Sequence, residues 1–303
     1  MATTSTGLAS TSPRTDARRG ALLAVASMVC VQLGLAASVG LLDRLAPLEV
    51  SWLRLAWAGL LLLVLVRPHP RRMARSTLVA CVLLGVLTAA VTMFFLAAVA
   101  RLPLGTASAV EFLGPLAVAV ARGSGRARWL FPALAACGVL LLTEPWNGAA
   151  DGIGLACALA AAGCWAGYIL LTQRVGDEVT GIRGLAISLP VAALVATAVA
   201  GPSAIGHLTP QLLLLGLGLA VLLPVVPFIL ELLALRRLTT AAFGTLMSLE
   251  PAVATLVGLL ALGQVPGPLP VLGIGLVVAA GIGAERTGAR RSSKRRAPGS
   301  GTD

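Results

Sequence analysis

The fold class is decided by residues 235–260, whose sequence is Leu-Arg-Arg-Leu-Thr-Thr-Ala-Ala-Phe-Gly-Thr-Leu-Met-Ser-Leu-Glu-Pro-Ala-Val-Ala-Thr-Leu-Val-Gly-Leu-Leu. Most of this stretch is apolar enough to cross a bilayer, yet Glu250 stands in its middle. An ionised carboxylate at that depth is costly, so such residues are rare and usually face a pore, a partner or a substrate. The stretch therefore predicts a membrane-spanning helix that carries a functional acid.

The rest of the chain has the composition of a polytopic membrane protein. Hydrophobic residues make up 57% of its 303 residues and charged residues 12%, against roughly 25% charged residues in a soluble domain. Asp, Glu, Lys and Arg are missing from three long runs, residues 20–42, 76–100 and 184–230. Each run reaches or exceeds the roughly 20 residues that a helix needs to cross the hydrocarbon core, so we predict an all-α membrane protein.

Clusters of glycine and proline divide the long apolar runs into single spans, for example at Gly201-Pro202 and near Pro266. Ten transmembrane helices result. Their predicted ranges are 20–42, 46–66, 77–100, 103–121, 128–143, 152–173, 184–201, 211–235, 239–262 and 268–284.

A second stretch, residues 100–121, is similar to the first one. Its acid, Glu111, is displaced by three residues, about one helical turn, from the register of Glu250. The matching residues are Arg101 with Arg237, Leu102 with Leu238, Leu113 with Leu249, and Pro115 with Pro251. We therefore predict two duplicated halves, residues 20–143 and residues 152–284.

Each half holds five predicted spans, and an odd number of spans gives the second half the opposite orientation in the membrane. Inverted repeats of this kind support alternating access, with the substrate site between the halves near the midplane. Residues 1–19 are expected to form a disordered leader, and residues 285–303 a basic tail.

Basic residues fall mainly on one side of this topology. With the N-terminus in the cytoplasm, 20 of the 23 Lys and Arg residues lie in predicted inner loops or terminal segments, and the others are Arg44, Arg54 and Arg101. The positive-inside rule then places both termini in the cytoplasm. The net charge of +11 is an orientation signal on this interpretation. Because the basic tail adjoins a span and lacks interleaved aromatic residues, we predict no nucleic-acid binding.

Residues that usually carry enzyme or metal chemistry are scarce. The five cysteines fall within predicted spans at spacings that match no metal or disulfide motif, and the two histidines fall in loops. The sequence has no catalytic triad, no glycine-rich phosphate loop and no loop long enough for a nucleotide-binding domain. We therefore predict neither an enzyme nor a bound metal or cofactor.

Three segments carry a resemblance to a known family. They are Arg101-Leu-Pro-Leu-Gly-Thr-Ala-Ser-Ala-Val-Glu-Phe-Leu-Gly-Pro115, Pro227-Phe-Ile-Leu-Glu-Leu-Leu-Ala-Leu-Arg236 and Gly244-Thr-Leu-Met-Ser-Leu-Glu-Pro251. They resemble the drug/metabolite transporter superfamily and, within it, the EamA-type branch of threonine and homoserine exporters. The resemblance implies a carrier of the bacterial cytoplasmic membrane that exports small metabolites, driven by protons. One departure is Gly263-Gln264 at the end of the ninth span, where such proteins often have Gly-Glu.

Arg54 and Glu111 are predicted at similar depths in parallel spans, so an ion pair between them is geometrically possible. Such a pair either neutralises two buried charges for stability or binds a zwitterion. Glu250 has no obvious cation at its depth, which suits proton coupling. The alternative is a protonated carboxyl group that bonds a backbone carbonyl for structural reasons.

Glu231 lies nearer the cytoplasmic end of its span, where a salt bridge to Arg236 or Arg237 is the favoured interpretation. Trp165 and Tyr168 stand well inside the sixth span, an unusual place for aromatic side chains with polar tips, so they either line a cavity or only pack.

Gln32, inside the first span, is a further candidate for lining a cavity. Two classes of function remain: a secondary carrier for amino acids such as threonine or homoserine, and a membrane subunit that does not transport. Buried acids in an inverted repeat favour the carrier, with the lipid bilayer, protons and a small-molecule substrate as its partners. Within carriers, drug efflux is the main alternative, although an aromatic content of 4% argues against a multidrug pocket.

Overall fold

The computed structural model describes residues 13–67, 74–122, 129–144, 151–176, 182–235, 237–238 and 240–295. These residues form helices and no strands. The α-helices are α1 (Pro13–Val39), α2 (Pro47–Val66), α3 (Arg75–Val99), α4 (Leu104–Glu111), α5 (Leu113–Arg122), α6 (Leu130–Thr143), α7 (Gly152–Gly176), α8 (Ile182–Ala204), α9 (Pro210–Ala220), α10 (Val226–Leu235), α11 (Thr240–Met247), α12 (Glu250–Leu262) and α13 (Pro268–Arg295). A 3₁₀ turn, η4 (Ile205–His207), follows α8, and a π-helical turn, η5 (Val221–Val225), joins α9 to α10.

Much of this chain forms helices that are long and apolar enough to cross a membrane. Seven helical stretches are at least 18 residues long and apolar enough to do so: Ala17–Val39, Pro47–Val66, Arg75–Val99, Leu104–Ala121, Gly152–Leu171, Gly184–His207 and Thr245–Leu262. Three shorter apolar helices are Leu130–Thr143, Pro210–Leu223 and Pro268–Gly283. The prediction of an all-helical membrane protein is thereby confirmed. Helix α1 begins at Pro13 and α13 ends at Arg295, so both reach beyond the predicted spans into the leader and the tail.

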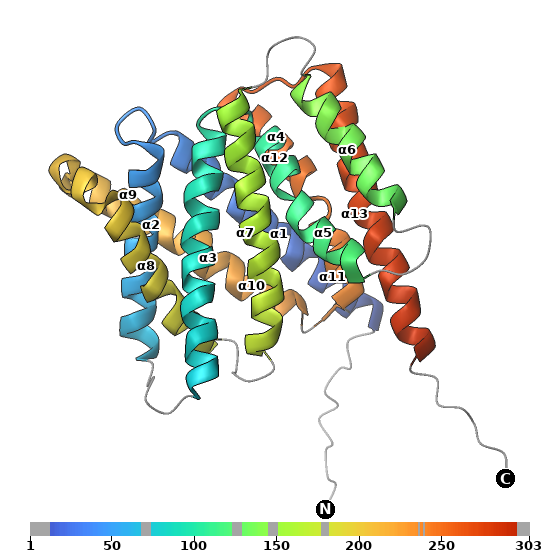
Figure 1. Ribbon diagram of the computed structural model, residues 1–303, viewed down its shortest axis with the longest axis horizontal. Coiled ribbons are helices and arrows are strands. Elements are labelled where there is room, and N and C mark those ends of the chain that lie inside the picture. The colour runs from blue at the N-terminus through green and yellow to red at the C-terminus, as the bar shows by residue number, and fades with distance from the viewer. Residues whose placement is uncertain are drawn as a thin grey trace, which may run out of the picture.

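Helix pairs build the bundle (Figure 1). α2 packs against α8, α3 against α7, and α6 against α13, while α1 runs through the interior against α10 and α12. Many large apolar side chains point outward, such as Leu63, Val64 and Leu65 on α2, which are 48%, 58% and 70% exposed. Outward-facing apolar side chains on helices of this length are what a lipid environment requires, because the helix satisfies its own backbone groups.

Glycines allow a close contact between α6 and α13. A Cβ atom at Gly138 of α6 would lie 2.7 Å from the carbonyl oxygen of Gly273, and one at Gly273 of α13 would lie 2.6 Å from the carbonyl oxygen of Gly138. Neither position can carry a larger side chain without moving a backbone. Small residues thus allow close helix packing here, as expected in a membrane bundle.

Two further glycines mark contacts between the first and second halves of the chain. A Cβ atom at Gly20 of α1 would lie 2.8 Å from Leu238 Cγ, and one at Gly154 of α7 would lie 2.9 Å from Leu102 Cγ. In each half, a glycine on the first helix thus packs against a leucine from the other half: Gly20 against Leu238, and Gly154 against Leu102.

Two predicted spans are each built from two consecutive helices instead of one. α4 and α5 take the place of the span 103–121, and α11 and α12 that of 239–262. Both breaks lie close to a proline, Pro115 or Pro251, which has no N–H to donate and whose ring crowds the carbonyl group four residues earlier.

Each break places an acid at the end of a helix. Glu111 is the last residue of α4, and Glu250 is the first residue of α12. A third acid, Glu231, follows the π-helical turn η5 on the next helix. Discontinuous helices are where many transporters hold their substrates, because the chain there leaves backbone and side-chain groups available.

Candidate functional site

Three polar side chains of α1 contact three charged side chains from other helices. We call Ser27, Gln32 and Ser38 the α1 polar series. The contacts are Ser27 Oγ to Glu231 Oε1 at 3.0 Å, Gln32 Nε2 to Glu250 Oε1 at 3.4 Å, and Arg54 Nη1 to Ser38 Oγ at 3.3 Å. All three residues of the series are almost fully buried. Helix α1 is thus the element that brings together acids of α10 and α12 and the arginine of α2.

The series covers a large part of the membrane thickness. Ser27 and Ser38 are eleven residues apart, or about 16 Å at a rise of about 1.5 Å per residue, against a hydrocarbon core of about 30 Å. The acids contact the middle and second half of α1, and the arginine contacts its last turn. Charge of both signs is therefore held along one helix through the interior.

Glu250 lies between the other two acids in a chain of electrostatic contacts. Glu111 is buried and lies within electrostatic reach of Glu250, which in turn lies within reach of Glu231. Like charges repel strongly away from water, so adding a charge to one of these carboxyl groups disfavours charge on its neighbour.

Two buried side-chain atoms have no hydrogen-bond partner in the described part of the chain. They are Oε1 of Gln32, whose amide nitrogen contacts Glu250, and Nε of Arg54. More than nine in ten buried polar groups in proteins are paired, and leaving one unpaired costs about 1–3 kcal/mol. One atom is an acceptor and the other is a donor. Together they are suited to a ligand that carries both a donor and an acceptor.

The structure differs from two pairings expected from the sequence. Arg54 and Glu111 form no ion pair, because the guanidinium turns to Ser38 on α1. Glu231 accepts from Ser27, and Arg237 instead donates to the carbonyl oxygen of Leu233 at 3.0 Å. Its other predicted partner, Arg236, lies outside the described residues.

Trp165 and Tyr168 lie on α7 and are half-buried, and they are not among the residues that line the cavity described next. A role for them in lining a substrate path stays a prediction. Gln32, a further candidate in the sequence, donates from its Nε2 to Glu250 Oε1 at 3.4 Å.

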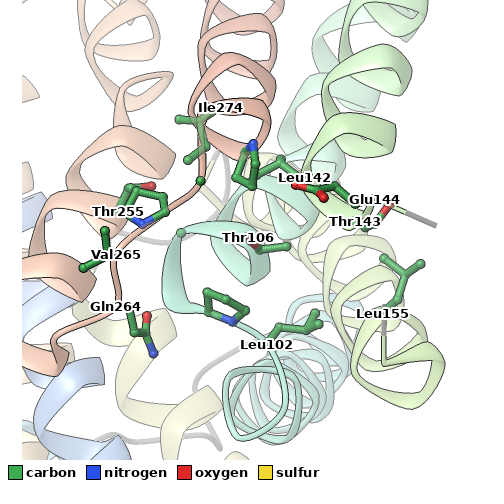
Figure 2. A pocket seen from close by; sticks show the side chains of 15 residues that line it. Leu102, Thr106, Leu142, Thr143, Glu144, Leu155, Thr255, Gln264, Val265 and Ile274 are labelled. Atoms are coloured by element: carbon green, nitrogen blue, oxygen red, sulfur yellow. The ribbon is translucent and has the colours of Figure 1, made fainter. Parts of the chain in front are cut away.

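A cavity of about 410 Å³ lies where α4, α7 and α13 begin and α6 and α12 end. Figure 2 shows Thr106, Thr255 and Gln264 on one side of it, with Thr143 and Glu144 on the other. Sequence reasoning did not find this cavity, because five separate helices build it. The departure at Gly263-Gln264 was the one signal that pointed there.

Gln264 ties two of these helices together. Its Oε1 accepts a hydrogen bond of 2.9 Å from the backbone N–H of Leu104, at the start of α4. A Cβ atom at Gly105 would collide with Thr255 Oγ1 of α12. The first turn of α4 is therefore pressed against α12 at the edge of the cavity.

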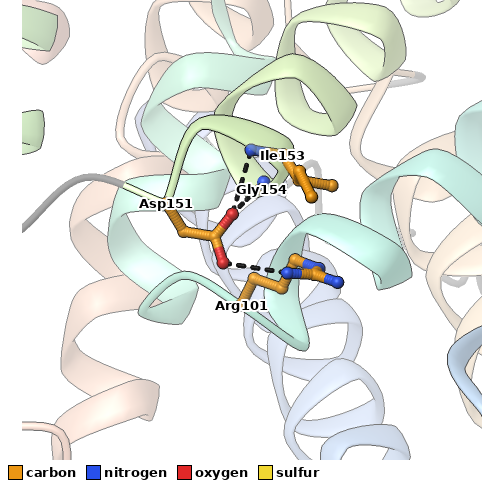
Figure 3. A network of polar contacts seen from close by, with 4 residues as sticks. All are labelled: Arg101, Asp151, Ile153 and Gly154. Carbon is orange, nitrogen blue, oxygen red and sulfur yellow. Dashed lines mark hydrogen bonds and ion pairs between the residues drawn. The ribbon is translucent and has the colours of Figure 1, made fainter.

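A polar network joins the start of α7 to the turn between α3 and α4 (Figure 3). Asp151 Oδ1 accepts from the N–H groups of Ile153 and Gly154 at 2.9 Å each, and Asp151 Oδ2 pairs with Arg101 at 3.0 Å. The N–H of Gly154 and then Arg101 hold the pKa of the Asp151 carboxyl group below its usual value. Asp151 thus caps α7 and links it to the first half of the chain.

No group of three or more His, Cys, Asp or Glu side chains within the described ranges is arranged to hold a metal ion.

Comparison with known proteins identifies the family. The model of the EamA-like transporter family matches residues 18–123 and again residues 152–283. The chain belongs to this family. The interrupted helices that carry Glu111 and Glu250 each fall within one of the two matched regions.

Two relatives of this EamA-family chain are named Threonine/homoserine exporter RhtA. The one from Escherichia coli (strain K12) is 34% identical over 278 residues, covering 90% of this chain and 93% of the relative. The one from Salmonella typhimurium (strain LT2) is 34% identical over 271 residues, covering 88% and 91%. A crystal structure of a protein with 17% identity aligns at a TM-score of 0.58 over 92% of this chain and 99% of its own, which supports the fold alone.

These matches extend over nearly the whole length of both partners. The EamA-family chain is therefore a membrane transporter of the exporter type and not an enzyme. It is a multi-pass protein of the bacterial inner membrane.

Proposed function

We propose that this EamA-family chain exports small zwitterionic amino acids of the threonine and homoserine class, in exchange for protons. The named activity of the relatives supports this substrate class. The observation that carries the proposal is the α1 polar series with its unfilled acceptor, Gln32 Oε1, and its unfilled donor, Arg54 Nε.

The proposed binding mode assigns each end of an amino acid to one charge. The ammonium group is received by Gln32 Oε1 together with Glu250, and the carboxylate is received by Arg54, whose planar guanidinium suits a carboxylate. Gln32 and Ser38, the partner of Arg54, are six residues apart, about 9 Å along the axis of α1. Since both charged groups of an α-amino acid are attached to one carbon, the long side chains of Gln32 and Arg54 have to reach toward each other along α1 to bind both groups.

Proton exchange follows from the grouping of Glu111, Glu250 and Glu231. When the site is empty and open to the outside, a proton on this group relieves the repulsion between the carboxylates. When the site opens to the cytoplasm, the ammonium group of the substrate takes over that role and the proton is released inside. Protons then move inward as the substrate moves outward.

The proposed topology has ten spans in two inverted halves, with both termini in the cytoplasm. The seven long and three shorter apolar helices support the number of spans, and the double family match supports the two halves. The reciprocal contacts of Gly20 with Leu238 and of Gly154 with Leu102 fit such a relation. The distribution of 20 of the 23 basic residues supports the orientation.

The test is uptake of radiolabelled homoserine by inside-out vesicles with an acidic interior. The wild-type protein is expected to accumulate homoserine only while the pH gradient lasts. Glu250→Gln, which keeps the shape of the side chain but cannot ionise, is expected to lose the response to the gradient. Asp43→Asn, at an exposed acid, is the control and should behave as wild type.

Gradient-driven uptake by Glu250→Gln at the wild-type rate would remove this acid from the mechanism. If the wild-type vesicles instead accumulate a hydrophobic cationic dye and no amino acid, the chain is a drug-efflux carrier. If they accumulate neither compound, the proposal of a secondary carrier for these substrates is wrong.

A further inference from the structure

The cavity lies on the two interrupted helices that also carry the acids. On α4, Thr106 lines the cavity five residues before Glu111, and on α12, Thr255 lines it five residues after Glu250. Five residues correspond to about 7.5 Å along a helix. The cavity therefore lies toward the start of α4 from Glu111 and toward the end of α12 from Glu250.

A tight contact between α4 and α12 lies at the edge of the cavity. Gly105 of α4 meets Thr255 of α12 so closely that a side chain at Gly105 would overlap Thr255 Oγ1. The hydrogen bond from the N–H of Leu104 to Gln264 Oε1 holds the same turn of α4 in place. The first turn of α4 is therefore fixed against α12 beside the cavity.

The lining of the cavity favours one kind of charge. Of the fifteen lining residues, Glu144 is the one with an ionisable side chain, and none is Lys, Arg or His. Thr143 Oγ1 donates to the carbonyl oxygen of Val139, and Thr255 Oγ1 donates to that of Pro251. Both hydroxyl oxygens therefore present their lone pairs as acceptors. Acceptors beside a carboxylate suit an ammonium group and disfavour an anion.

The size of the cavity suits a small ligand. About 410 Å³ lies within the range of about 300–1,000 Å³ that is typical of small-molecule sites. Leu102, Leu142, Leu155 and Ile274 supply apolar surface between the polar groups. An ammonium compound with a short apolar body fits this lining.

We propose that this cavity is a second, outer binding site for small ammonium compounds, which the exported substrate occupies on its way out. The assignment to the outer face rests on the orientation given under the proposed function. Binding of an ammonium compound to the cavity does not require that the chain transports it.

The test measures how a bound ligand protects a cysteine in the cavity. Leu155→Cys is made in a variant whose five native cysteines are replaced by alanine, and intact cells are treated with a membrane-impermeant maleimide. Ile153→Cys is the matched control, because it lies two residues away on α7, is 60% exposed and does not line the cavity. Threonine methyl ester is the cationic probe, and N-acetylthreonine is the anionic probe.

Both cysteines are expected to react from outside. Threonine methyl ester should slow the labelling of Leu155→Cys but not that of Ile153→Cys, and N-acetylthreonine should slow neither. Adding Glu144→Gln should raise the concentration of ester that half-protects Leu155→Cys by about tenfold, since a charge-assisted hydrogen bond is lost.

Three results would overturn the inference: Leu155→Cys reacting only in permeabilised cells, equal protection by the anionic probe, or unchanged protection after Glu144→Gln. Homoserine uptake by the vesicles described above separates the two proposals. Uptake without protection rejects the outer site alone, and protection without uptake rejects the proposed substrate alone.

Discussion

Gln32→Leu separates a binding role of this residue from a structural one. Gln32 is 1% exposed, and its amide makes one long hydrogen bond of 3.4 Å to Glu250 while its Oε1 has no partner in the described part of the chain. Leucine is of similar size but has no polar atoms. The substitution therefore removes a weak bond worth about 0.5–1.5 kcal/mol and also an unpaired acceptor that costs about 1–3 kcal/mol.

The difference between these terms predicts a variant that is as stable as wild type or more stable by about 1–2 kcal/mol. At about 2–4 °C per kcal/mol for a chain of this order of size, its melting temperature should stay the same or rise by a few degrees. Homoserine transport should nevertheless fall by about tenfold or more, because the ammonium group loses its acceptor.

The assay combines thermal melting of the purified protein in detergent with homoserine uptake by inside-out vesicles, normalised to the amount of folded protein. Gln211→Leu, at an exposed position of α9, is the control for the same chemical change. A lower melting temperature, with uptake that falls only in proportion to the folded protein, would show that Gln32 serves structure and would refute this reasoning.

Three further outcomes are expected. Arg54→Lys keeps the charge near Ser38 but loses the planar fork, so homoserine uptake should fall while membrane abundance stays unchanged; wild-type uptake would show that only the charge matters. Gly138→Ala should lower stability by about 1–3 kcal/mol through overpacking, whereas Gly163→Ala, where nothing lies within 4 Å, should not; equal melting temperatures of the two variants would contradict the packing argument. Since the folded-state pKa of Asp151 is lowered, its stabilising effect is present at neutral pH and lost as pH falls through that pKa. Asp151→Asn should therefore melt earlier than wild type at neutral pH, with a difference that shrinks in acid, and a difference independent of pH would reject the ionic contribution.

The apolar runs were sufficient to predict the membrane helices, because the length of a span is imposed by the bilayer and is visible in composition. The breaks after Glu111 and before Glu250 were not predicted. Proline marks where a helix can be interrupted, but neighbouring helices decide whether it bends or breaks, and a single sequence does not show those neighbours.

The sequence showed which charged residues within the spans were candidates for function, but it did not show which side chains they contact. Arg54 and Glu250 stood out because charges are rare inside spans. Their contacts, Ser38 and Gln32, are on α1, and nothing local in the sequence places α1 between α2 and α12. Depth alone suggested that Arg54 would meet Glu111, whereas the rotation of each helix about its axis determines which side chains face each other.

The α1 polar series also sets an order of events during synthesis. Ser27 and Gln32 are made first, and their partners Glu231 and Glu250 follow 204 and 218 residues later. At about 5–20 residues per second, the first helix waits about 10–40 s in the membrane before those contacts can form. During that interval its buried polar atoms face lipid, water defects or temporary neighbours. The contacts of Ser27 and Gln32 are therefore completed only when the C-terminal half is made. A chain that stops before Glu231 leaves these two side chains of α1 without their acidic partners.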